Sequence, residues 1–132
     1  MVMKFGSFIF LYLFSYAIFA EQESAKAIIQ ASKDEGIILS EIAKKNIGFG
    51  TSNLVGTSPF KVPRSALVYS RDVIGLYLIK DRWIKMVPVK VVSMDSGYAL
   101  VESSALKVSS EIVTSGVPLV RVSEMEAFST AE

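Results

Sequence analysis

Ser103, Ser104 and Ser109 lie close to Lys107 in the sequence, so a serine nucleophile with a lysine base is a chemistry that this neighbourhood could support. The 132 residues contain no histidine and no cysteine, which excludes a Ser-His-Asp triad and the ligands that zinc prefers. No pattern around these serines marks a strained nucleophile turn or an oxyanion hole. The sequence therefore predicts no catalytic residue, no cofactor and no enzyme.

Met86, Met94 and Met125 carry thioethers, which suit monovalent copper because soft ligands bind this soft ion. They occur singly, as methionines that fill gaps in a hydrophobic core commonly do. The sequence therefore defines no metal site. A soluble periplasmic carrier of copper(I) or of another small ligand stays open as an alternative function.

Residues 48–53 (GFGTSN) begin like a dinucleotide-binding fingerprint, but the third glycine is missing. The two glycines also follow a predicted short helix instead of opening one. The pattern favours a helix C-cap and a loop.

Trp83, Tyr77 and Tyr98 could form an exposed aromatic contact patch. Their positions on predicted hairpin strands favour half-buried packing instead. Lys44 and Lys45 indicate the solvated face of a short helix.

Residues 1–20 have the order of a secretory signal peptide: Lys4, then an apolar run over residues 5–19, then Ala20 before Glu21. The run is shorter than the ~20 residues that cross a membrane as a helix. We expect cleavage before Glu21 and a periplasmic location. An uncleaved N-terminal anchor is the alternative, because Ile18 stands where a small residue is usual.

Charge and cysteine content narrow the classes of partner. Without Lys4 the chain has 13 basic residues against 13 acidic ones, and they are interspersed, so nucleic acid is not an expected partner. The absence of cysteine excludes a lipidated cysteine and disulfides. Peripheral association with a membrane is compatible with this composition.

The predicted organisation after the signal is one domain with short extensions. Residues 21–36 are polar and alanine-rich and predict a linker or weak helix. Residues 37–122 form the single β-rich domain, which begins with an apolar run and a helix over residues 41–47 capped by Ser40. Residues 123–132 are expected to be a flexible tail.

Short segments rich in β-branched residues dominate that domain. A strand is expected at residues 37–39 and one brief strand within residues 48–59, and an extended pattern covers residues 61–69. Further strands are predicted at 74–79, 83–92, 98–101 and 111–114, and the stretch 118–122 ends the domain. Turns are expected at Lys80–Arg82 and at Asp95–Gly97. The pattern predicts a mainly β fold, a small antiparallel β-roll or barrel with one short helix.

Four segments together resemble one protein family: residues 62–67 (VPRSAL), the hairpin around Tyr77 and Trp83, residues 87–91 (VPVKV) and residues 112–119 (IVTSGVPL). In this order they are similar to the membrane-proximal domain of periplasmic adaptor proteins, also called membrane fusion proteins, of resistance-nodulation-division efflux pumps. Residues 38–48 are similar to the segment that opens the same domain in heavy-metal adaptors. The likeness covers most of residues 37–122.

The chain departs from that family in two ways. Adaptors usually have Gly-Leu-x-x-Gly before the final strand, whereas residues 105–110 (ALKVSS) contain no glycine. The lipoyl-like domain, the β-barrel domain and the long helical hairpin of a full adaptor have no room here.

The resemblance implies a non-enzymatic, stand-alone binding module. Its expected partners are an inner-membrane efflux transporter, a full-length adaptor, or both. A truncated adaptor with little function of its own is a further hypothesis. The sequence does not indicate which residues would bind the partner.

Overall fold

The computed structural model describes residues 27–129, and the predicted signal peptide at residues 1–20 lies outside the described residues. Ten strands occur in this range: β1 Ile28–Ser32, β2 Gly36–Leu39, β3 Gly50–Asn53, β4 Phe60–Pro63, β5 Val68–Ser70, β6 Val73–Lys80, β7 Trp83–Pro88, β8 Lys90–Met94, β9 Tyr98–Glu102 and β10 Glu111–Ser115. The helices are α2 Glu41–Asn46, the 3-10 turn η1 Arg64–Ala66 and α3 Val117–Ser129.

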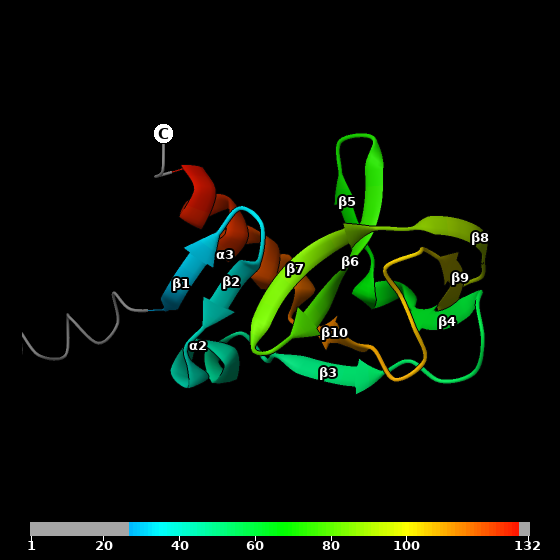
Figure 1. Cartoon of the computed structure of the whole chain (residues 1–132), viewed down its shortest axis with the longest axis horizontal. Helices are drawn as coiled ribbons and strands as arrows, with labels where there is room; N and C mark the ends of the chain where they lie inside the picture. Colours follow the sequence, from blue (N-terminus) through cyan, green and yellow to red (C-terminus); the bar gives the residue numbers. More distant parts are fainter. Residues whose placement is uncertain (1–26, 130–132) are drawn as a thin grey trace, which may run out of the picture.

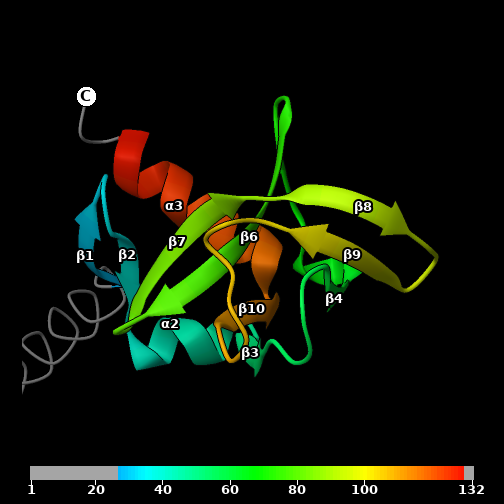
Figure 2. The same cartoon turned by 45° about the vertical axis from the view of Figure 1, so that its right-hand side comes forward.

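The strands form two open antiparallel sheets (Figures 1 and 2). The larger sheet has the order β1-β2-β7-β6-β10-β3, with β5 paired to β6 beside this path. The smaller sheet has the order β4-β9-β8. The prediction of a mainly antiparallel β fold is therefore confirmed, with sheets that stay open rather than closing into a barrel.

Strand β6 is buried on both faces, and its alternation divides the core in two. Leu76 belongs to a cluster between the two sheets, with Phe60, Val101 and Ile112 among its members. Tyr77 points to the opposite face, where residues of β2, β7 and β10 pack together with Val117 and Val120 of α3. Successive strand residues point to opposite faces, so one strand can serve both clusters.

Nearby residues fix the start of the predicted short helix and the positions of two predicted turns. The hydroxyl of Ser40 accepts a hydrogen bond from the amide of Ala43 at 3.1 Å, which confirms the N-cap of α2. The β6–β7 turn lies at Asp81 and Arg82, inside the predicted segment. The Asp95 carboxylate accepts a hydrogen bond from the Tyr98 amide, with 2.7 Å between the nitrogen and Oδ1, and so closes the β8–β9 turn.

The prediction of a linker or weak helix over residues 21–36 is wrong for its described part. Residues 28–39 form the β1–β2 hairpin, with Ser32 paired to Gly36. The hydroxyl of Ser32 accepts the amides of Asp34 and Glu35, both at 3.3 Å, and so closes the turn. Pairing with β2, which is buried along its whole length, holds β1 extended although most residues of β1 are exposed.

The prediction of a flexible tail over residues 123–132 is also wrong where the structure describes it, and residues 118–122, which the sequence analysis includes in the β-rich domain, are helical. Gly116 takes a φ of 78°, after which α3 begins at Val117. Pro118 lies in the first turn of α3, where its missing N–H costs nothing. Burial of Val117 and Val120 against the larger sheet stabilises this helix. The domain therefore spans residues 28–129.

Neither α2 nor α3 is long and apolar enough to cross a bilayer, and no other helix within residues 27–129 is.

Candidate functional site

The serines considered as nucleophiles lie in the loop between β9 and β10, where this part of the chain forms a hydrogen-bonded turn. The hydroxyl of Ser103 accepts the amide of Ala105 at 3.1 Å. The hydroxyl of Ser110 accepts the amide of Lys107 at 3.0 Å, and the amide of Ser109 donates to the carbonyl of Leu54 at 2.9 Å. These contacts make a compact turn in which the hydroxyls of Ser103 and Ser110 hold backbone amides.

The three methionines lie on different elements. Met86 of β7 packs against the cluster beneath α3. Met94 ends β8 in the smaller sheet, and Met125 is exposed on the outer side of α3. The structure therefore does not bring these three thioethers to one copper(I) site. Within residues 27–129 there is also no group of three or more acidic side chains that could hold a metal ion.

The predicted aromatic patch is divided between environments. Tyr77 is fully buried, Trp83 is half-buried, and Tyr98 is exposed beneath the ammonium of Lys61, which lies 4.2 Å from its ring centroid. Half-buried packing thus describes Trp83 alone. The GFGTSN segment ends α2 at Gly48, whose φ is 68°, and continues into β3, as expected for a helix C-cap.

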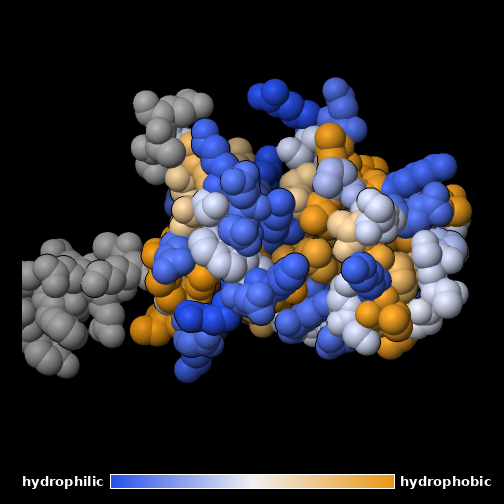
Figure 3. All heavy atoms as spheres, viewed as in Figure 1, coloured by the Kyte–Doolittle hydropathy of each residue, from blue (hydrophilic) through white to orange (hydrophobic). Residues whose placement is uncertain are grey.

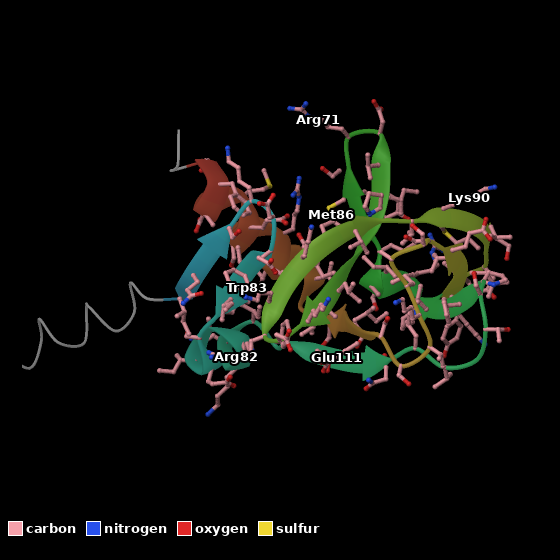
Figure 4. The ribbon with its side chains drawn as sticks, in the orientation of Figure 1. Arg71, Arg82, Trp83, Met86, Lys90 and Glu111 are labelled. Atoms are coloured by element: carbon pink, nitrogen blue, oxygen red, sulfur yellow. The ribbon has the colours of Figure 1, made fainter. Side chains whose placement is uncertain are left out.

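A hairpin arm made of β5 and β6 projects from the body of the molecule (Figures 1 and 2). Arg71 lies at its tip (Figure 4), and Tyr69 and Val73 flank the tip with exposed fractions of 61% and 41%. In Figure 3 the tip is hydrophilic, with hydrophobic atoms directly below it. The arm therefore presents apolar side chains away from the core.

A chain of polar contacts ties this arm to α3. Arg121 donates from Nη2 to the hydroxyl of Ser70 at 2.8 Å and from Nη1 to Oε1 of Glu124 at 2.6 Å. The hydroxyl of the buried Tyr77 donates to the same Glu124 oxygen at 3.0 Å. Ser70 and Tyr77 lie in β5 and β6, whereas Arg121 and Glu124 lie in α3. The contacts therefore fix the helix against the arm.

The surroundings of this network change the acidity of two of its members. Burial raises the pKa of the Tyr77 phenol, and the negative charge of Glu124 raises it further. The hydrogen bond to Glu124 raises the pKa of the Arg121 guanidinium. Tyr77 therefore stays a neutral donor and Arg121 a cation, which are the states that the network needs.

The outer side of α3 carries three exposed apolar side chains beside the exposed Glu126, whereas the exposed side of a surface helix is usually polar. Leu119 and Val122 are each 48% exposed, and Met125 is 55% exposed. Spacings of three residues place them on one side of the helix, away from the buried Val117 and Val120. We call these three residues and the arm residues Tyr69 and Val73 the arm–helix surface.

The arm–helix surface was not identified from the sequence. The sequence predicts no helix after Gly116, because residues 118–122 are included in the β-rich domain and residues 123–132 in a flexible tail. The one local sign of a helix was the spacing of Arg121 and Glu124, which matches a helical ion pair.

No protein-family model, curated protein or solved structure matches this chain. The likeness to efflux adaptors therefore rests on the motifs in the sequence.

Proposed function

We propose that this chain is a non-enzymatic binding module of the cell envelope that is exported to the periplasm by residues 1–20. Its partner is an inner-membrane efflux transporter or the full-length adaptor of such a transporter. The observation that carries the proposal is the arm–helix surface, an exposed apolar surface on a braced frame.

Exposed apolar side chains on one helix side and a neighbouring arm are typical of contact sites, because water solvates such a surface poorly. Arg121 and Glu124 brace it, so little conformational entropy is lost when a partner binds. A rigid apolar surface of this kind suits a protein partner better than a small ligand, which needs a concave site.

The segments that resemble adaptors support the choice of partner. Residues 62–67 span the end of β4 and η1, residues 87–91 join the two sheets, and residues 112–119 lead from β10 into α3. The second glycine of the adaptor pattern Gly-Leu-x-x-Gly corresponds to Ser109, which adopts a φ of 74°. The backbone at this position thus has the conformation that favours glycine, although the residue is serine.

Site-specific crosslinking in cells tests the proposal. A photoreactive amino acid replaces Val122 in the exported chain, and mass spectrometry identifies the proteins captured from the envelope. Val92 of β8 is the matched control, because it is 49% exposed against 48% for Val122 but lies in the smaller sheet. We expect an efflux transporter or adaptor to be captured from Val122 and not from Val92.

Two results would contradict this expectation. Capture of neither a transporter nor an adaptor would reject the partner class. Equal capture from both positions would reject the arm–helix surface as the contact.

A further inference from the structure

A second surface lies at the end of the molecule opposite the arm, where α2, β3 and the β6–β7 turn meet (Figures 1 and 2). It contains two hollows of about 490 and about 520 Å³. The first lies between α2 and the turn, and the second lies between the turn and the loop at residues 105–110. Ile79 and Glu111 line both hollows, so together they form one groove, here called the turn groove.

The floor of the turn groove is apolar, with Phe49, Ile79 and Ile84 in its first part. Its rim is mainly basic. Five cations line the two hollows: Lys44, Lys45, Lys80, Arg82 and Lys107. The two carboxylates of the lining are already engaged, since Glu41 lies 3.5 Å from the ammonium of Lys44 and Glu111 accepts the hydroxyl of Thr51 at 2.9 Å.

Four of the rim cations are available to a ligand. Lys45, Lys80, Arg82 and Lys107 are exposed, and within residues 27–129 none of them forms an ion pair. Asp81 lies between two of them in the turn and offsets one charge. The groove therefore favours a ligand that combines apolar groups with several negative charges.

Strand β3 borders the turn groove. It is the last strand of the larger sheet and pairs only with β10, so its outer edge has no strand partner among the described residues. Gly50, Thr51 and Asn53 of this strand line the groove. Four lining residues pair across neighbouring strands, so the groove is elongated across the sheet, a shape that fits an extended chain: Ile84, Ile79, Glu111 and Asn53.

The backbone conformation of Arg82 is strained for a residue with a long side chain. Its φ is 75°, in the left-handed region that glycine adopts freely and a long side chain does not. A two-residue hairpin turn usually places glycine at this second position. Arg82 (labelled in Figure 4) lines the first hollow together with Lys44 and Lys45 of α2.

We propose that the turn groove binds an extended acidic and apolar segment of a partner polypeptide, with Arg82 as its specificity-determining residue. The partner's apolar side chains meet the floor, and its carboxylates meet Arg82 and Lys45. This site is separate from the arm–helix surface, so the two proposals stand or fall independently.

Fluorescence anisotropy with the exported chain purified from the envelope tests the proposal. The probe is a labelled ten-residue peptide of alternating glutamate and valine. We expect Arg82→Gly to weaken binding roughly tenfold, as for the loss of a charge-assisted hydrogen bond. The same substitution relieves the turn, so thermal stability rises or stays equal and misfolding cannot explain the loss.

Arg71→Gly is the matched control, because Arg71 is also an arginine in a hairpin turn with positive φ, at 53°, and lies at the opposite end of the molecule (Figure 4). It should bind the peptide as tightly as the unmodified chain. A peptide of alternating lysine and valine should not bind. Equal binding by Arg82→Gly and the unmodified chain, or of the glutamate and the lysine peptides, would overturn the proposal.

Discussion

The hydroxyl of Tyr77 in β6 donates a hydrogen bond to Oε1 of Glu124 in α3 at 3.0 Å. The same oxygen accepts from Arg121 at 2.6 Å, so one carboxylate serves two donors. Glu124 is therefore the shared acceptor that joins the helix to the sheet.

Replacing Glu124 with alanine leaves the buried Tyr77 hydroxyl and the half-buried Arg121 without that acceptor. We expect the free energy of unfolding to fall by about 2 kcal/mol, whereas Glu124→Gln, which keeps an acceptor, loses about 1 kcal/mol. Urea denaturation of the three proteins measures the difference. An alanine variant as stable as the unmodified chain would show that the contact does not stabilise the fold.

Alkaline pH should unfold the protein through Tyr77. Burial and the neighbouring Glu124 charge raise the pKa of this phenol above its ordinary value. A group with a raised folded-state pKa gives stability that is complete below the pKa of the unfolded tyrosine, about 10, and is lost as pH rises beyond it. Urea midpoints at about pH 8 and pH 11 should therefore differ less in Tyr77→Phe than in the unmodified chain. The same loss in both proteins would assign the effect to other groups.

Acidic pH should loosen the β8–β9 turn. The amides of Tyr98 and Gly97 donate to Asp95 and lower the pKa of its carboxyl. A lowered folded-state pKa gives stability that is present above the pKa of unfolded aspartate, about 3.9, and is lost as pH falls. The amide resonances of Tyr98 and Gly97 should shift during an acid titration. Asp95→Asn should abolish that shift, and a persisting shift would exclude Asp95 as its source.

Ser109→Gly should stabilise the protein. Ser109 has a φ of 74°, where a residue with a Cβ is strained and glycine is not. Part of the gain is offset by the greater freedom of glycine in the unfolded chain, so we expect about 0.5 to 1 kcal/mol. Ser110→Gly is the contrasting variant, because it removes the hydroxyl that accepts the amide of Lys107. A thermal melt in which Ser109→Gly unfolds earlier would refute the strain.

Gly36→Ala should detach the β1–β2 hairpin. Gly36 has a φ of 104°, and an added Cβ would collide with the carbonyl of Ile84 in the adjacent strand. We expect a loss of more than about 2 kcal/mol, because strained backbone and overpacking add together. At Gly97 an added Cβ meets no atom within 4 Å, so Gly97→Ala is the control. Equal melting temperatures for the two variants would contradict the close approach.

Short-range signals predicted much of the sheet. Ser40, Asp95 and the Lys80–Arg82 turn act on residues two to four positions away, so their effects can be read locally. The strands flanking those turns follow from their β-branched residues. The β3 edge and the turn groove could not be predicted in this way, because they exist only after segments distant in the sequence have paired.

The sequence of α3 shows why this helix was not predicted. Its buried positions, Val117 and Val120, have helical spacing, but the exposed Leu119, Val122 and Met125 are also apolar. A segment that is apolar on both sides hides its period, and β-branched valines then favour a strand. The same apolar outer face that concealed the helix is what makes it a candidate contact surface.

The strand order has a consequence for how the chain reaches its native state. Strand β10 lies between β6 and β3, although it is the last strand to be synthesised. The larger sheet therefore cannot be completed until the chain is available through Ser115, and such non-local pairing slows folding. A nascent chain with this topology can form the β1–β2, β6–β7 and β8–β9 hairpins early, but β3 gains its only strand partner among the described residues after β10 has been made.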